Sequence, residues 1–151
     1  LASAGGDKLV RIWEIPSAKQ VLAMKGHGRY VNSTAWSPNG LMLASVGVRD
    51  IRNGNVHGKN FFVWESKTGK VLYSKNAEED LRSVVWSPDG AKLATAGDDK
   101  VIKIWAINLS QPVTLIAGHE GVINEIAWSP DGTKIASSSD DKTVKIWSVT
   151  E

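Results

Sequence analysis

The stretch GHEGVINEIAWSPDGTKIASSSDDKTVKIW, residues 118–147, decides how the whole chain is interpreted. It contains His119, Ser137 and Asp141, which are the residue types of a hydrolytic triad. The same residue types also serve as hydrogen-bond partners of one another inside a fold. The number of times the set occurs distinguishes the two interpretations, because a catalytic triad is needed only once.

Phrases of this stretch recur along the chain, so the sequence is a repeat. Trp-Ser-Pro-Asp/Asn-Gly begins at Trp36, Trp86 and Trp128, at spacings of 50 and 42 residues. A second phrase follows each time (LMLASVG, AKLATAG and TKIASSS), and a related one, LASAGG, opens the chain. A third phrase contains a tryptophan and closes each unit: LVRIWEI, FFVWESK, VIKIWAI and TVKIWSV.

The repeated phrases predict β-strands, because they are short, rich in Val, Ile and aromatic residues, and alternate with period two. In VKIW, Val144 and Ile146 share one face of the strand, and Lys145 and Trp147 share the other. A further strand is expected in each linker, in KQVLAMK, KVLYSK and QPVTLIA. Each unit should therefore hold four strands in about 42 residues, with no helix. Pro-Asn-Gly and Pro-Asp-Gly turn signals lie between strands at 38–40, 88–90 and 130–132.

With these phrases the sequence resembles the WD-repeat β-propeller family, whose repeats of ~40–45 residues carry a Gly-His near the start and a Trp near the end. Here His27 pairs with Trp64, and His119 with Trp147, although the Asp that follows Trp in the family name is absent. The resemblance covers essentially the whole chain. It implies an all-β propeller of four-stranded antiparallel blades, with about 3.5 repeats of a usually seven-bladed ring. The units run over 1–15 (partial), 16–65, 66–107 and 108–151.

The resemblance also implies a hydrogen-bonded tetrad of Trp, Ser or Thr, the Gly-His histidine and a turn Asp. Asp7, Asp99 and Asp141 each lie six residues before the Trp of their unit, and this recurrence favours a structural role over catalysis. Such buried groups need partners, because an unpaired one costs on the order of 1–3 kcal/mol. The catalytic alternative lacks an identifiable oxyanion hole. The tetrad positions are His119, Ser137, Asp141 and Trp147 in the last unit, His27, Ser45 and Trp64 in the second, and Thr95, Asp99 and Trp105 in the third.

Two units depart from this pattern. The second has Gly58 at the Asp position and carries VRDIRNGNVHGKN between Gly47 and Phe61, about eight residues more than its siblings, which predicts a longer loop. The third reads Ala-Glu-Glu-Asp at 77–80 where Gly-His should stand. Both blades are therefore expected to be less tightly tied than the last.

The composition is that of an ordinary globular protein, with 42% hydrophobic and 23% charged residues in 151. No apolar run approaches the ~20 residues that span a bilayer, so no membrane segment is expected. The absence of cysteine excludes disulfides and thiolate metal sites and fits an intracellular protein. The charge of +2 is spread along the chain and predicts no nucleic-acid footprint. His27, His57 and His119 lack metal-ligand spacing, and no phosphate-binding loop is present, so neither metal nor cofactor is expected.

The resemblance predicts an incomplete ring, because the chain opens in a second strand at 1–4 and stops just after a third at 144–149. Propellers have ~4–8 blades, and an open ring leaves strand edges that recruit partners. Three alternatives follow: a fragment of a longer propeller, a chain that completes a ring by self-association, and an open arc that stands alone. The fragment is the favoured alternative.

The family resemblance implies a non-catalytic scaffold that binds other proteins or peptides, although fold alone does not give function. The alternatives are a designed or fragmentary self-associating propeller with no native partner, and an enzyme. The favoured surface is formed by the loops between fourth and first strands and between second and third strands. Tyr30 is the strongest anchor there, and the basic insertion suits either an acidic peptide or phosphate, or no partner at all. The candidate contacts are Tyr30, Ser33, Asp80, Ser83, Asp98, Val122, Glu125 and Asp140 on this face, and Arg49, Arg52, His57 and Lys59 in the insertion.

Overall fold

The computed structural model describes residues 1–106 and 111–149, and within them the chain forms strands and turns without a helix. Every pairing between the strands of its sheets is antiparallel, so the predicted all-β class is confirmed. Blade 1 contains β1 (Ala2–Ala4), β2 (Leu9–Trp13) and β3 (Gln20–Lys25). Blade 2 contains β4 (Val31–Trp36), β5 (Met42–Gly47), β8 (Phe61–Glu65) and β9 (Val71–Lys75). Blade 3 contains β10 (Leu81–Trp86), β11 (Lys92–Gly97), β12 (Val101–Ala106) and β13 (Pro112–Ala117), and blade 4 contains β14 (Ile123–Trp128), β15 (Lys134–Ser139) and β16 (Val144–Ser148).

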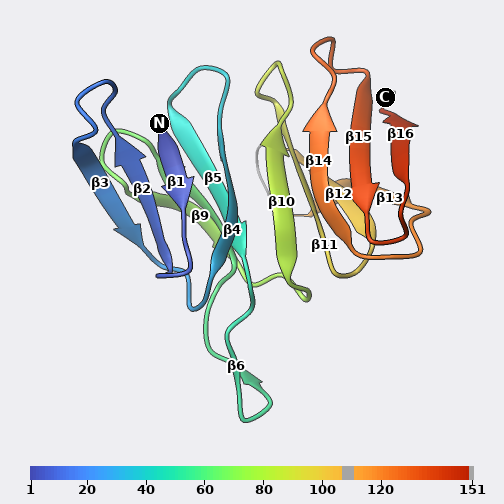
Figure 1. The fold of residues 1–151 in the computed structure, drawn as a ribbon, viewed down its shortest axis with the longest axis horizontal. Helices are drawn as coiled ribbons and strands as arrows, with labels where there is room; N and C mark the ends of the chain where they lie inside the picture. The colour runs from blue at the N-terminus through green and yellow to red at the C-terminus, as the bar shows by residue number, and fades with distance from the viewer. Residues whose placement is uncertain (107–110, 150–151) are drawn as a thin grey trace.

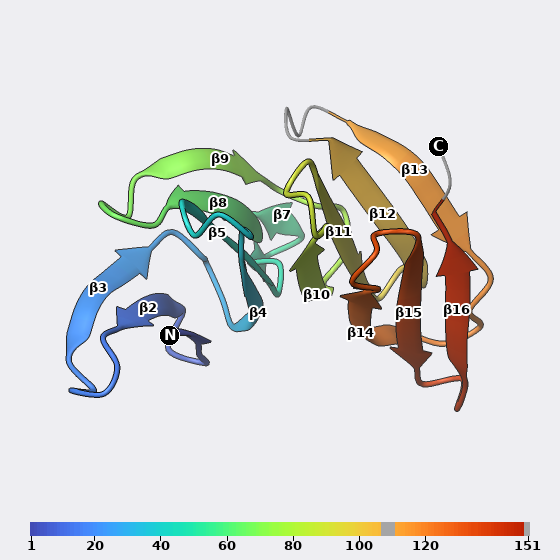
Figure 2. The same cartoon turned by 90° about the horizontal axis from the view of Figure 1, so that it is seen from above.

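The four blades stand side by side in an arc, as Figures 1 and 2 show. The first strands of blades 2, 3 and 4, namely β4, β10 and β14, contact one another along the inner side of the arc. The strand that comes from each linker lies at the outer side. It pairs with the preceding tryptophan strand, since β3 bonds to β2, β9 to β8 and β13 to β12. The linker strand therefore completes the sheet of the unit before it.

Apolar side chains between neighbouring blades form the core. In blade 3, Ile102 and Ile104 are 0% and 1% exposed and pack against Ile123 and Ile135 of blade 4. The same register positions are buried in blades 1 and 2, where they pack against the next blade along the chain. Burying one such side chain contributes about 1.5–3 kcal/mol, so the junctions between blades supply most of the apolar stabilisation.

Blade 4 differs because, among the described residues, no blade packs against the face of its sheet that is turned away from blade 3. Val144 and Ile146 occupy the register positions of Ile102 and Ile104, yet they are 72% and 71% exposed. Their strand, β16, lies at one end of the arc in Figure 2. The last sheet thus presents a bare apolar face of the same type as those buried in the other three blades.

The Ser-Pro-Asp-Gly phrases form the turns at one end of the blades. In blade 3, the Ser87 hydroxyl donates to Asp89 Oδ1 at 2.5 Å, and the same oxygen accepts the Ala91 N–H at 2.9 Å. Gly90 then takes a φ of 72°, which a glycine adopts without steric cost. Equivalent bonds form in blades 2 and 4, so the repeated phrase encodes one turn. We call this end the Pro-Gly face; it comprises residues 37–41, 87–91 and 129–133.

The opposite end is the histidine face, comprising residues 5–8, 26–30, 48–60, 76–80, 98–100, 118–122 and 140–143. The insertion of blade 2 projects from it as a β-hairpin of β6 (Ile51–Arg52) and β7 (Asn55–Val56), seen at the bottom of Figure 1. The predicted longer connection between the second and third strands is confirmed, and its middle part forms this short hairpin. Asn53 and Gly54 have φ of 51° and 77°, the two positive values of a type I′ turn, and this turn matches the twist of a hairpin.

Candidate functional site

The polar residues of blade 4 form a continuous chain of hydrogen bonds. Trp147 Nε1 donates to Ser137 Oγ at 2.7 Å, and that hydroxyl lies 2.7 Å from His119 Nε2. His119 Nδ1 lies 2.6 Å from Asp141 Oδ2. An ionised carboxylate can only accept hydrogen bonds, so Nδ1 of a neutral imidazole donates to Asp141. Nε2 then accepts the hydrogen bond that the Ser137 hydroxyl donates. Every member is thus satisfied, and the loop before β14 is bonded to the turn before β16.

The glycine of the Gly-His phrase makes this approach possible. A Cβ added to Gly118 would lie 2.9 Å from the Trp147 ring, and Gly118 has a φ of 151°. At the other end of the chain of bonds, the Thr143 hydroxyl, His119 and the Glu120 N–H all bond to Asp141 and hold the pKa of its carboxyl well below the usual range. Asp141 therefore stays ionised and available as an acceptor.

This arrangement is poorly suited to nucleophilic catalysis. Ser137 is 2% exposed, so a substrate carbonyl cannot reach its hydroxyl without the sheet opening. The hydroxyl oxygen already accepts the Trp147 N–H, which lowers its electron density and its freedom to rotate. The same Trp-to-hydroxyl bond recurs in each of the other blades, where Trp13 bonds to Ser3 and Trp105 to Thr95.

Blade 2 keeps half of the bond chain and replaces the rest with aromatic packing. Trp64 Nε1 donates to Ser45 Oγ at 2.8 Å, and His27 Nε2 lies 2.7 Å from the same oxygen. With Gly58 at the Asp position, His27 Nδ1 is buried without a partner. Phe62 stacks on Trp64 with ring centroids 4.8 Å apart and lies 4.6 Å from the His27 ring. Burial lowers the pKa of His27 to about 4, so the imidazole is neutral at pH 7.

Blade 3 replaces the missing imidazole with an ammonium. Lys103 Nζ lies 2.9 Å from Asp99 Oδ2 and also bonds to Glu79 Oε1, in the loop where Gly-His is absent. Burial opposes the charge on Lys103, but its hydrogen bonds to Asp99 and Glu79 outweigh this and raise its pKa. The loop is thus bonded to the turn by an ion pair. The expectation that this blade is less tightly tied than the last stays a prediction, and it did not take into account the ion pairs of Lys103.

The expected partner contacts on the histidine face separate into several groups, the first of which lies between blades. Ser33 Oγ accepts the Val84 N–H at 3.3 Å, and Ser83 Oγ accepts the Ile126 N–H at 3.2 Å. Ser83 is buried, so the expectation that it is an exposed contact was wrong. A register shift in the first strand of each complete blade directs these hydroxyls towards the neighbouring strand. Glu125, at the same position in blade 4, is exposed on the uncovered side.

The acidic candidates are already engaged within the chain. Asp98 accepts the Arg82 guanidinium at 2.7 Å, and Asp140 accepts the Asn124 amide at 2.6 Å. Arg82 and Asn124 sit at the register shifts of their strands. Val122, half-buried, accepts the Asp140 N–H with its carbonyl. Each of these groups thus has a partner within the chain, and the two aspartates hold the turn before the third strand to the first strand of their blade.

Tyr30 remains open to contact. It is 53% exposed, and its carbonyl accepts the Val48 N–H at the base of the insertion. At the equivalent position in blade 3, Asp80 accepts both the backbone N–H of Arg49, at 2.9 Å, and its guanidinium. Arg49 also donates to the Glu78 carbonyl. The insertion is thereby anchored to both blades 2 and 3.

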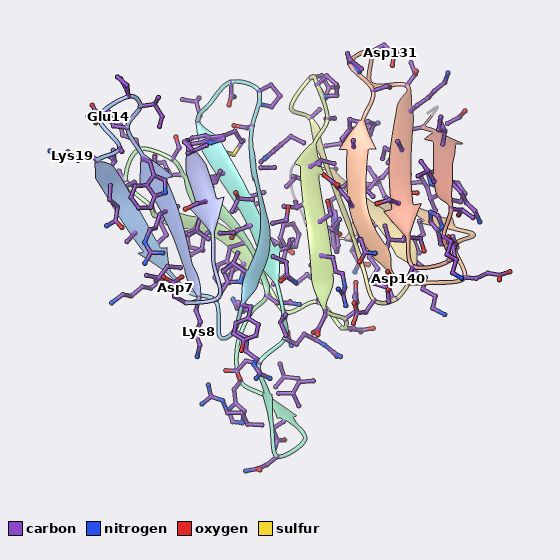
Figure 3. The ribbon with its side chains drawn as sticks, in the orientation of Figure 1. Asp7, Lys8, Glu14, Lys19, Asp131 and Asp140 are labelled. Atoms are coloured by element: carbon purple, nitrogen blue, oxygen red, sulfur yellow. The ribbon has the colours of Figure 1, made fainter. Side chains whose placement is uncertain are left out.

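The four basic residues of the insertion do not form one cluster. Arg49 faces Asp80, and Lys59 Nζ donates to Ser74 Oγ at 2.7 Å on the outer strand. Arg52 pairs with Asp50, and His57 is exposed on the hairpin. Figure 3 places the labelled Asp7, Lys8 and Asp140 at the histidine face, with Asp131 at the Pro-Gly face.

Residues 1–106 and 111–149 contain neither a cluster of metal-ligating side chains nor a helix that could span a membrane. In that part of the chain, no three carboxylate, imidazole or thiol side chains converge as they would around a metal ion. The same residues contain no helix long and apolar enough to cross a membrane.

The chain matches the family described as WD domain, G-beta repeat over residues 18–56, 69–106 and 110–148. It is 31% identical over 102 residues to the small ribosomal subunit protein RACK1 of Neurospora crassa, covering 68% of this chain and 29% of that protein. It is 33% identical over 124 residues to the transcriptional corepressor LEUNIG_HOMOLOG of Arabidopsis thaliana, covering 81% and 14%. With WD repeat-containing protein 1 of Xenopus tropicalis it shares 31% identity over 118 residues, covering 76% and 18%. The chain thus spans less than a third of the length of each of these relatives.

Proposed function

The chain belongs to the WD domain, G-beta repeat family, and from this premise we propose that it is a non-catalytic scaffold that binds other proteins or peptides through its histidine face. The polar sets of the blades serve to hold the loops of that face in place. Two relatives are named as a ribosomal subunit protein and a transcriptional corepressor, which supports a role in an intracellular assembly.

The observation that carries this proposal is the projecting hairpin beside the exposed Tyr30. An aromatic side chain that is 53% exposed on a rigid loop is a typical anchor for a partner. The hairpin adds Ile51 and Val56, which are paired across its two strands and 41% and 47% exposed. Isolated apolar residues are common on surfaces, but apolar side chains that are paired on an anchored, projecting hairpin favour contact with a partner.

A photo-crosslinking experiment tests this face directly. A photoreactive amino acid replaces Tyr30, and in a matched variant it replaces Asp131 on the Pro-Gly face (Figure 3). Cells carrying each variant are irradiated, and the adducts are identified by mass spectrometry. We expect a defined protein adduct with the first variant and a different pattern, or none, with the second.

A variant without the hairpin is the second part of this experiment. Replacing residues 48–58 with Asp-Asp copies the turn of blade 3 at Asp98 and Asp99 and removes β6 and β7. The variant should fold, because the new Asp stands where His27 lacks a partner, and it should lose the Tyr30 adduct. An unchanged adduct would show that the hairpin does not take part. Equal adducts from both faces would overturn the proposal.

Self-association is the second candidate function, and the bare face of blade 4 favours it. Val144 and Ile146 are exposed although equivalent residues are covered by another blade elsewhere in the arc. A surface that is apolar and regular in this way packs against a complementary sheet face, from the same protein or from another copy. The test is the apparent mass in solution.

A further inference from the structure

A pocket of about 250 Å³ lies on the histidine face, beside the base of the hairpin. It is lined by basic side chains from three different segments. Lys8 comes from the turn of blade 1, Arg29 from the loop before β4, and Arg52 from the hairpin strand β6. Gly28, Asp50 and Ile51 complete the lining.

Asp50 orients one of these cations. Its carboxylate is buried and bonds to Arg52 Nε at 3.0 Å and Nη2 at 2.7 Å. This two-point contact fixes the plane of the guanidinium, while the Arg52 side chain remains 61% exposed. Since guanidinium has five N–H donors, those not facing Asp50 stay free to bind a further group. Gly28 allows the packing, because a Cβ there would lie 2.6 Å from Asp50 Cβ.

Within 1–106 and 111–149, the other two cations have no hydrogen-bond or ion-pair acceptor, although the charge of Lys8 helps to lower the pKa of the Asp50 carboxyl. The Lys8 ammonium forms no hydrogen bond or ion pair there, and the turn that carries it holds φ at 72°. The Arg29 guanidinium contacts only the Tyr30 ring, 6.0 Å from its centroid. Both side chains are exposed and line the pocket with Arg52. Three cations around one pocket repel one another, so an anion in the pocket would be favoured.

The charges define the chemical class of the ligand. Three cations and one carboxylate, that of Asp50, leave a net charge of +2 at the pocket. A phosphorylated side chain carries about −1.5 to −2 at pH 7 and offers three acceptor oxygens, whereas a carboxylate carries one charge and two oxygens. Ile51 adds an apolar surface for a neighbouring residue, and it is 41% exposed.

We propose that the pocket of Lys8, Arg29 and Arg52 binds a phosphorylated serine, threonine or tyrosine of a partner peptide, with an apolar neighbour packed on Ile51. The proposal rests on the scaffold function and specifies its ligand. Arg49 anchors the hairpin to Asp80, so the pocket is formed before the ligand arrives. The insertion that distinguishes blade 2 thus supplies the oriented guanidinium of the site.

The experiment measures peptide binding by amide chemical shifts of the isotope-labelled chain. The probe is a short peptide with one central phosphoserine between leucines. Matched peptides carry serine or glutamate at that position, and a single-stranded oligonucleotide is a separate arm. We expect the phosphopeptide to shift the amides of residues 28–29 and 50–52, with weaker effects from glutamate and none from serine.

Charge-removing variants test the individual contacts. Lys8→Asn keeps a residue that tolerates positive φ, and Arg29→Gln keeps a long polar side chain. Each variant should lower the affinity for the phosphopeptide about tenfold, because it loses one charge-assisted hydrogen bond. Lys142→Asn is the matched control, since Lys142 occupies the same turn in blade 4 with φ of 68°, and it should bind as the parent does.

The outcomes separate the alternatives. Equal shifts from serine and phosphoserine peptides, or an equal loss with Lys142→Asn, would overturn the phosphate site. If the oligonucleotide shifted the same amides and bound more tightly than the phosphopeptide, the assignment of a peptide ligand would be overturned. If the Tyr30 photo-adduct still forms in either case, the scaffold proposal stands and only the ligand assignment fails.

Discussion

Lys103 Nζ lies 2.9 Å from Asp99 Oδ2, at the place where blade 4 uses an imidazole. The lysine is two residues before the blade tryptophan, and the same position is Arg11 in blade 1, 2.6 Å from Asp7. In blade 2 the position is Phe62, and the Asp is absent as well. A cation at this position thus accompanies a turn carboxylate, and an aromatic ring accompanies its loss.

Replacing Lys103 with methionine should destabilise the chain by about 2 kcal/mol, because it leaves Glu79 buried without a counter-charge. The Lys103 side chain is 20% exposed, which keeps the cost below that of a fully buried pair. Lys145→Met is the control, since Lys145 donates to the Gly118 carbonyl and lies 6.0 Å from the centroid of the Trp147 ring, and its loss should cost less than about 1 kcal/mol. Urea unfolding of both variants gives the comparison, and equal values would refute the bridging role of Lys103.

His119→Ala should lower the melting temperature, with a loss of about 2 kcal/mol, because it removes both imidazole hydrogen bonds and leaves the buried Ser137 hydroxyl without its acceptor. His27→Ala removes one hydrogen bond, to Ser45, and should therefore lower the free energy of unfolding less than His119→Ala does. Thermal unfolding of the two variants tests this order. A His119→Ala chain as stable as the parent would be incompatible with a structural tetrad.

Stability should fall as the pH is lowered from about 6.5 to 4, in part through His27. Its pKa is lowered to about 4 in the folded chain, so below 6.5 the unfolded chain binds a proton that the folded chain excludes. This destabilising effect is therefore absent well above pH 6.5 and grows to roughly 3 kcal/mol towards pH 4. His27→Gln should lack this part of the pH dependence. Parallel pH profiles for variant and parent, measured by denaturant unfolding, would contradict the assignment.

The bare face of blade 4 should tolerate a charge that the internal junctions cannot. Ile146→Lys should change the unfolding free energy by less than about 0.5 kcal/mol, as surface substitutions do. Ile104→Lys, at the same register position in blade 3, should unfold the chain because it buries an unpaired ammonium. If copies associate through this face, Ile146→Lys should also lower the apparent mass in sedimentation. An unchanged mass would exclude this face from self-association.

The repeat phrases were sufficient to predict strands, turns and the direction in which side chains point. Val144 and Ile146 share a face as their alternation requires, and each Pro-Gly signal forms a turn. These features depend on local spacing and backbone preference, which a sequence expresses directly. The hairpin at Asn53-Gly54 was not predicted, although this pair is a typical hairpin signal, because the flanking strands have only two residues each.

Features that depend on contacts between units could not be predicted in the same way. The register shift that turns Ser83 towards Ile126 is not visible as a pattern, since it arises from pairing with the next strand. The pairing of Lys103 with Glu79 joins residues 24 positions apart and requires the blade geometry. Arg52 was identified as a candidate, but its partners Lys8 and Arg29 lie in other segments and meet it only in the fold.

The placement of the linker strand has a practical consequence for dividing this protein. A cut at a unit boundary, before β9 for example, would remove the outer strand from blade 2 and leave β8 with unpaired backbone groups. A cut after the outer strand, within 76–80, would instead leave both neighbouring sheets with all their strands. Each sequence unit therefore lends one strand to the sheet of the unit before it. Truncations at the boundaries of sequence units should aggregate, whereas truncations at the boundaries of sheets should not.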